Sequence, residues 1–107
     1  MSTRTERDSL GEWVVPAEAD YGVHTARAAA NFPITGTLLR HYPELVVALA
    51  MTKKAAAEAN AKLGVLDPRI ASAISAACDR LIAGENHQHF IVDMVQGGAG
   101  TSTNMNA

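Results

Sequence analysis

Two alanine-rich stretches with clearly marked ends constrain the fold of this chain more than any other feature. The first begins at Pro43 and stops at Gly64, and the second begins at Asp67-Pro68 and stops at Gly84. Proline suits the first turn of a helix, and glycine suits the position just after the last turn. Because only a short connection separates the two stretches, the sequence predicts two helices that pack antiparallel.

The apolar residues are distributed differently in these two helices. The second helix carries one apolar stripe at spacings of three and four, formed by Ile70, Ile74, Ala77 and Leu81. The first is about 21 residues, or about 30 Å, long, and residues 45–51 are apolar on every side, which predicts burial on every side. A chain of 107 residues has little material for that. We therefore expect other chain segments or other subunits to cover this helix, and the isolated chain to self-associate.

The remaining segments are predicted to be shorter. Residues 1–11 are polar and read as a loosely ordered arm, whereas residues 12–16 are β-prone and read as an extended segment. Asp20 is the expected N-cap of a short helix, and Pro33 disfavours helical geometry at the residue before it. Residues 90–96 are predicted to be extended and mostly buried. The predicted fold class is mainly α, with short extended segments.

Composition and charge argue against several classes of function. The net charge is −2 and no long run of one sign occurs, so neither a nucleic-acid footprint nor a nucleic-acid partner is expected. The longest apolar run, 45–51, is far shorter than the ~20 residues that a membrane helix needs. Cys78 is the only cysteine and the polar N-terminus does not resemble a signal peptide, which favours a reduced, cytoplasmic setting.

The most informative stretch for chemistry is the glycine-rich loop at residues 96–107. Three glycines among residues 97–100 let the backbone approach a ligand closely, and hydroxyl and amide side chains follow. A nucleotide-binding phosphate loop would place a lysine before the hydroxyl residue, but Gly100 precedes Thr101 here. Two interpretations stay open on the residues alone: a carboxylate-binding loop, or a plain turn with a Thr or Ser helix cap.

Other candidate residues are weaker. His87 and His89 form a pair that meets one metal ion only if the segment is a strand, with Asp93 nearby, and a solvated polar turn is favoured over a metal site. His24 is a candidate general base, but a structural or exposed role is favoured. Arg27 suits a carboxylate, although a salt bridge that holds the N-terminal segments together is favoured.

Two further positions have simpler interpretations. Lys53 and Lys54 lie in the middle of the first long helix and read as a solvated patch. Cys78 has no neighbouring histidine or lysine in the sequence that would activate it, so we expect an inert thiol.

Several motifs occur in an order and at spacings that resemble the N-terminal part of the aspartate ammonia-lyases of the aspartase/fumarase superfamily. They lie at residues 8–11, 15–17, 21–25, 31–34, 53–56 and 96–106. The last of them is similar to the first of three signature regions of that superfamily. At position 99 the alanine is more similar to the aspartases, since class II fumarases tend to have serine there. The resemblance covers nearly the whole chain.

The resemblance implies a mainly helical, homotetrameric lyase that converts L-aspartate to fumarate and ammonia without a cofactor or metal. The first signature region contributes hydrogen bonds to a substrate carboxylate in this family. Carried over residue by residue, the expected substrate-binding residues are Thr101, Ser102, Thr103 and Asn104. The match is most direct at Thr101.

The resemblance also implies what this chain lacks. The catalytic base of the family is a serine in a mobile loop far downstream, so no catalytic residue is expected here, and the active site is assembled from three subunits. We expect residues 1–107 to be a truncated N-terminal lyase domain, without the central helical bundle or the C-terminal domain, and inactive alone. Ile91 departs from the proline usual in the family, and His87 and His89 are unusual there. The alternatives are a class II fumarase or a non-catalytic helical binding or assembly module.

Overall fold

The structure is a computed structural model that describes residues 2–107. It is mainly α-helical, as predicted, and divides into two compact units. One unit comprises the residues up to His41 together with Gln88–Ala107, and the other comprises Tyr42–His87. Across residues 2–107, the model contains no helix with the length and apolar character needed to cross a membrane.

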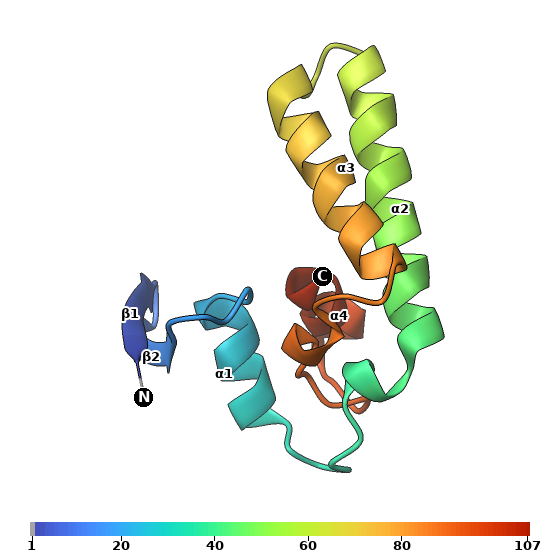
Figure 1. Cartoon of the computed structure of the whole chain (residues 1–107). Coiled ribbons are helices and arrows are strands. Elements are labelled where there is room, and N and C mark those ends of the chain that lie inside the picture. The colour runs from blue at the N-terminus through green and yellow to red at the C-terminus, as the bar shows by residue number, and fades with distance from the viewer. Residues whose placement is uncertain (1) are drawn as a thin grey trace. The chain divides into compact units, whose positions relative to one another are not determined.

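The Tyr42–His87 unit is the predicted pair of antiparallel helices, α2 (Pro43–Lys62) and α3 (Pro68–Ile82) (Figure 1). The carboxylate of Asp67 caps α3 by accepting the N–H of Arg69 at 2.8 Å. Gly64 and Gly84 follow the two helices with φ of 75° and 97°, a backbone conformation that favours glycine. The proline and glycine signals therefore placed the ends of both helices correctly.

The buried face of α3 is offset from the predicted stripe. Ala71 and Cys78 are buried, whereas the side chain of Ile70 is 52% exposed. Small side chains on this face allow α2 and α3 to approach closely. Lys54 was predicted to belong to a solvated patch. In the structure its ammonium also pairs with the Asp79 carboxylate at 2.6 Å. This carboxylate raises the pKa of Lys54.

The first unit opens with a β-hairpin, and here the prediction of a loosely ordered arm is wrong. Strands β1 (Thr3–Asp8) and β2 (Gly11–Pro16) pair antiparallel, with Asp8 opposite Gly11. Met1 lies outside the described residues. The inward positions of β1 are polar, and their hydrogen bonds explain its order. The Arg4 guanidinium, for example, donates to four backbone carbonyls: those of Pro16, Ala17, Ala19 and Tyr21.

Helix α1 (Val23–Asn31) begins later than predicted, and Asp20 does not cap it. Glu6 on β1 accepts the first helical N–H, that of Val23, at 2.8 Å, so a neighbouring strand supplies the cap. The Arg4 side chain is the main cause that lowers the pKa of Glu6. The helix ends just before Pro33, as expected from the restriction that proline imposes.

The segment that leads to the glycine loop packs against the chain after α1. Short 3-10 helices form at Leu39–His41 and His87–His89. At the start of the first of these helices, the N–H of Leu39 donates to the carbonyl of Val92 at 3.0 Å. The predicted extended segment at 90–96 forms one isolated bridge, between Leu38 and Asp93, and not a regular strand. The side chains of Leu39 and Val92 are both buried.

Candidate functional site

The glycine loop has three successive residues with positive φ. Gly98, Ala99 and Gly100 have φ of 73°, 55° and 83°, so they form a left-handed turn, which the Thr101 N–H closes by donating to the Gly98 carbonyl. This conformation is inexpensive for glycine but rare for alanine. Helix α4 (Thr101–Asn106) follows directly. It begins at Thr101 and not near residue 105 as predicted, and no side chain caps it, so the interpretation as a Thr or Ser cap is wrong.

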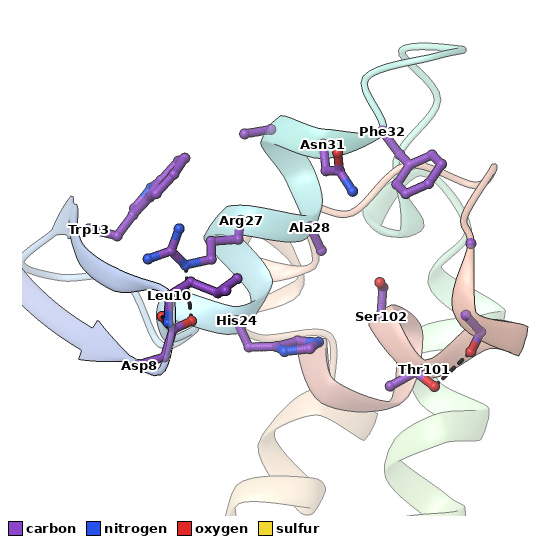
Figure 2. Close-up of a pocket in the computed structure, with 13 residues that line it drawn as sticks. Asp8, Leu10, Trp13, His24, Arg27, Ala28, Asn31, Phe32, Thr101 and Ser102 are labelled. Atoms are coloured by element: carbon purple, nitrogen blue, oxygen red, sulfur yellow. Dashed lines mark hydrogen bonds and ion pairs between the residues drawn. The ribbon is translucent and has the colours of Figure 1, made fainter.

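Thr101 and Ser102 line an open pocket of about 830 Å³, whereas Thr103 and Asn104 do not (Figure 2). The opposite wall comes from α1 and the β-hairpin. Among its lining residues are Asp8, Trp13, His24, Arg27, Asn31 and Phe32. The structure therefore brings two of the four predicted substrate-binding residues to one cavity.

The two pocket hydroxyls differ in their hydrogen bonds. The Thr101 hydroxyl donates to the Gly98 carbonyl at 2.7 Å, inside its own loop. Ser102 makes no side-chain hydrogen bond within residues 2–107, and Figure 2 shows its oxygen turned toward the wall that carries Asn31 and Phe32. The Ser102 hydroxyl can therefore donate to a ligand without breaking a bond, whereas the Thr101 hydroxyl must first break its hydrogen bond to the Gly98 carbonyl.

Thr103 is held by the side chain of Gln96, which was not among the predicted site residues. Its N–H donates to the Gln96 side-chain oxygen at 3.0 Å, and its hydroxyl accepts from the Gln96 amide at 2.7 Å. The same amide donates to the Asp93 carbonyl at 2.9 Å. The sequence alone gives no signal for this contact, because it spans seven residues and depends on how the glycine loop folds.

Arg27 is engaged by the hairpin, as the sequence analysis favoured. Its guanidinium pairs with Asp8 at 2.9 Å, donates to the Gly11 carbonyl at 3.0 Å and lies 4.9 Å from the centre of the Trp13 ring. Burial opposes ionisation of Asp8, but the Leu10 N–H and the Arg27 side chain outweigh burial and lower the pKa of Asp8. The salt bridge thus ties β1 to α1, with the acidic partner that sequence reasoning could not identify.

His24 and Gly97 also line the pocket. His24 is exposed and its ring points toward Thr101 in Figure 2. Gly97 lies against Phe32, because a Cβ atom at Gly97 would be 3.0 Å from the ring carbon Cζ. Position 97 thus favours glycine because of the close approach to the ring, since its φ of −88° is one that other residues also adopt.

Asp93 anchors the segment before the loop. Its carboxylate accepts the N–H groups of Val95, Thr35 and Gly36 and the hydroxyl of Thr35, all between 2.8 and 2.9 Å. These bonds, the one from Val95 first, lower the pKa of Asp93 from 3.8 to about 2. The residue is 2% exposed and does not line the pocket, so this carboxylate is structural.

The other candidates have separate roles. His87 contacts the Leu81 carbonyl at 2.7 Å and His89 contacts Asp20 at 3.4 Å, and the pair lies on a 3-10 helix and not on a strand. No group of three metal-binding side chains occurs among the residues that the structure describes. Burial raises the pKa of the Cys78 thiol, which makes it a poor nucleophile, as expected.

Comparison with known proteins identifies the family. A family described as "Lyase" matches residues 11–107. The aspartate ammonia-lyase of Pseudomonas fluorescens is 60% identical over 99% of this chain, which covers 22% of that protein. A class II fumarate hydratase of Halobacterium salinarum is 54% identical over 97% of this chain and 22% of its own length. The chain thus spans about a fifth of the length of these relatives.

Solved structures agree with this assignment. The fumarate lyase:delta crystallin of Brucella melitensis superposes with a TM-score of 0.95 at 54% identity, over 99% of this chain and 25% of that one. The class II fumarase of Schistosoma mansoni gives 0.90 at 37% identity, over 98% and 22%. The chain belongs to the lyases of the aspartase/fumarase superfamily and corresponds to the N-terminal portion of its members.

Proposed function

We propose that this chain is the N-terminal part of an aspartate ammonia-lyase, which eliminates ammonia from L-aspartate to give fumarate, and that its glycine loop binds a substrate carboxylate. The observation that carries the proposal is the placement of Thr101 and Ser102 in one pocket, directly after three residues of positive φ. The 60% identity to a protein of that name supports the choice of reaction.

Neutral hydroxyl donors suit the chemistry of such an elimination. In the family that the chain resembles, a base removes a proton from the carbon next to the side-chain carboxylate. The carboxylate then carries two negative charges before ammonia leaves. A hydroxyl that donates to an oxygen of this carboxylate stabilises the transition state more than the ground state, because the negative charge on the carboxylate grows as the transition state forms.

Thr101 and Ser102 have complementary parts in this proposal. The Ser102 hydroxyl donates to the incoming carboxylate without losing a protein partner. The Thr101 hydroxyl exchanges its 2.7 Å bond to Gly98 for a bond to the substrate. Because the carboxylate has no donor of its own, the Thr101 proton must turn away from Gly98 for this contact to form. The contact roles predicted for Thr103 and Asn104 stay predictions, since neither residue lines the pocket.

Several properties of the whole protein follow from the same proposal. It is a cytoplasmic homotetramer that needs no cofactor and has neither a nucleic-acid nor a membrane partner. The base lies outside this sequence, so residues 1–107 alone do not release ammonia from aspartate. Mixing them with the remaining part of the enzyme should restore ammonia release, whereas turnover by the chain alone would place the base within it.

The test of the loop is Thr101→Val in the full-length protein that carries this chain. Loss of one donor aimed at developing charge costs on the order of 10²–10³ in turnover. Thr101→Ser keeps the hydroxyl and is the matched control, which should retain most of the activity. Turnover near that of the wild type in Thr101→Val would overturn the carboxylate-binding role.

A class II fumarase is the second candidate, because a fumarate hydratase is 54% identical to this chain. Ala99 stands where such fumarases tend to have serine, which favours the ammonia-lyase. The two reactions are separated by supplying fumarate with and without ammonia to the full-length protein. Formation of aspartate only with ammonia supports the ammonia-lyase, and formation of malate supports the fumarase.

A further inference from the structure

The side chain of Gln96 closes the glycine loop at its base. The loop leaves Gln96, passes through three residues of positive φ and returns as the first turn of α4. Gln96 binds both polar groups of Thr103 that face it, at 3.0 and 2.7 Å, across seven residues of sequence. The residues between them include Thr101 and Ser102, which line the pocket.

We propose that Gln96 is a positioning residue, which fixes the hydroxyls of Thr101 and Ser102 at the carboxylate site without touching the substrate. This inference rests on the proposed function of the loop. A segment with three glycines loses much conformational entropy when it is fixed in one form. The Gln96–Thr103 contact restrains both ends of that segment, so it limits the directions in which the two hydroxyls can point.

A side-chain amide matches the three contacts at this position. Gln96 offers one acceptor, which takes the Thr103 N–H, and two donor hydrogens, which serve the Thr103 hydroxyl and the Asp93 carbonyl. All three contacts are thereby satisfied. A glutamate here would keep the Thr103 N–H but would set a carboxylate oxygen against the Asp93 carbonyl, where no hydrogen is available.

A second amide on α4 provides a comparison. Asn106 donates to the His89 carbonyl at 2.9 Å and accepts the Ile91 N–H at 2.9 Å, so it also ties α4 to the segment before the loop. Its contacts lie at the C-terminal end of the helix, away from the glycines. Loss of Asn106 should therefore weaken the packing of α4 without releasing the glycine loop.

The test uses the full-length protein with Gln96→Ala, Gln96→Glu and, as the matched control, Asn106→Ala. The measurements are kcat and KM for aspartate, the Kd of succinate as a dicarboxylate that lacks the amine, and Tm. We expect both Gln96 variants to lose kcat/KM on the order of 10²-fold, because a small misplacement of aligned groups has such an effect, and to bind succinate more weakly. Asn106→Ala should lower Tm with a much smaller loss of kcat/KM.

Three results would overturn the positioning role. They are unchanged kcat/KM in folded Gln96→Ala, an equal loss in Asn106→Ala at equal Tm, or unchanged affinity for succinate. If Gln96→Ala does not assemble, Thr103→Val removes the bond from the Gln96 amide to the Thr103 hydroxyl while it keeps the bond from the Thr103 N–H, and Thr103→Ser restores the hydroxyl. The valine variant should lose activity and the serine variant should keep it, and equal activity of the two would also overturn the role.

Failure of this inference is distinguishable from failure of the proposed function. Thr101→Val is measured in the same series. Lost activity in Thr101→Val with full activity in Gln96→Ala overturns the role of Gln96 alone. Full activity in Thr101→Val overturns the carboxylate-binding loop, and the role of Gln96 with it.

Discussion

Thr35 binds the carboxylate of Asp93 twice, through its N–H at 2.9 Å and its hydroxyl at 2.8 Å, although 58 residues separate them in the sequence. The Gly36 N–H adds a third bond from the same turn. The turn after α1 is thereby fastened to the segment that enters the glycine loop. One α1 residue, Asn31, and the loop residue Ser102 line the same pocket, so this bond network supports the spacing of two of its walls.

Asp93 predicts an acid-sensitive contribution to stability. Its pKa is lowered from 3.8 to about 2 in the folded chain, so the folded state binds fewer protons than the unfolded state between these values. The stabilisation is complete above pH 3.8 and is lost as the pH falls toward about 2. Asp93→Asn, which retains one acceptor oxygen, should be less stable than the wild type at neutral pH. The measurement is the free energy of unfolding of both proteins as a function of pH.

Thr35→Val tests one of the hydrogen bonds to Asp93 separately. It removes the hydroxyl bond but keeps the backbone N–H bond, so it should destabilise the chain less than Asp93→Asn. The difference between the wild type and Asp93→Asn should shrink as the carboxylate becomes protonated. A difference that is constant across this pH range would contradict the assignment of the carboxylate as the cause.

Gly97 predicts a steric effect on the pocket. A Cβ atom at this position would lie 3.0 Å from Cζ of Phe32, so Gly97→Ala must displace either the ring or the loop. We expect a loss of about 1–3 kcal/mol in stability, as for other overpacked sites, measured by denaturant unfolding. Phe32→Leu removes the ring edge. In that background Gly97→Ala should cost clearly less, and an equal cost in both backgrounds would show that the ring is not the obstacle.

The two long helices could be predicted from the sequence because local signals decide where they begin and end. Pro43 and Gly64, and Asp67 and Gly84, mark helix ends through the conformations that these residues prefer, and the structure has both helices at those bounds. The salt bridge of Arg27 was favoured from its chemistry alone. Its partner, Asp8, lies 19 residues away on a strand that was not predicted.

The failures concern contacts between distant segments. Strand β1 was missed because its inward positions are Arg4, Glu6 and Asp8, so it shows no alternation of apolar residues. Their hydrogen bonds go to residues that the fold brings near. A signal was present in the turn, since the Asp8 carboxylate accepts the Leu10 N–H at 2.9 Å and Gly11 follows with φ of 118°.

The exposed apolar residues of the helical pair predict association of the isolated chain. Leu63 and Val65, in the connection between α2 and α3, are 75% and 73% exposed, and Met51 on α2 is 54% exposed. Sedimentation at several concentrations should show self-association, driven by burial of this apolar surface. Leu63→Ser together with Val65→Ser should reduce it, whereas exposed Ser72→Asn should not. A monomer at all concentrations would contradict the prediction.

Arg4 predicts that order in the N-terminal segment depends on the geometry of a guanidinium. One nitrogen of its side chain donates to the carbonyls of Pro16, Ala17 and Ala19, and another donates to that of Tyr21. Arg4→Ala removes these four hydrogen bonds, although the Pro16 carbonyl keeps the Ala19 N–H, and should cost about 1–3 kcal/mol. Arg4→Lys should recover little of it, because an ammonium is a point donor and cannot span both sides of the fork.

The measurement for Arg4 is urea unfolding combined with hydrogen exchange of the amides in β2 and α1. Arg7, on the exposed face of the same strand, is the matched control, and Arg7→Ala should leave both observables unchanged. Exchange should accelerate in Arg4→Ala at Val23, whose N–H is held by Glu6, because Arg4 pairs with that carboxylate at 2.8 Å. Equal effects of Arg4→Ala and Arg7→Ala would mean that strand propensity, and not the carbonyl contacts, orders this segment.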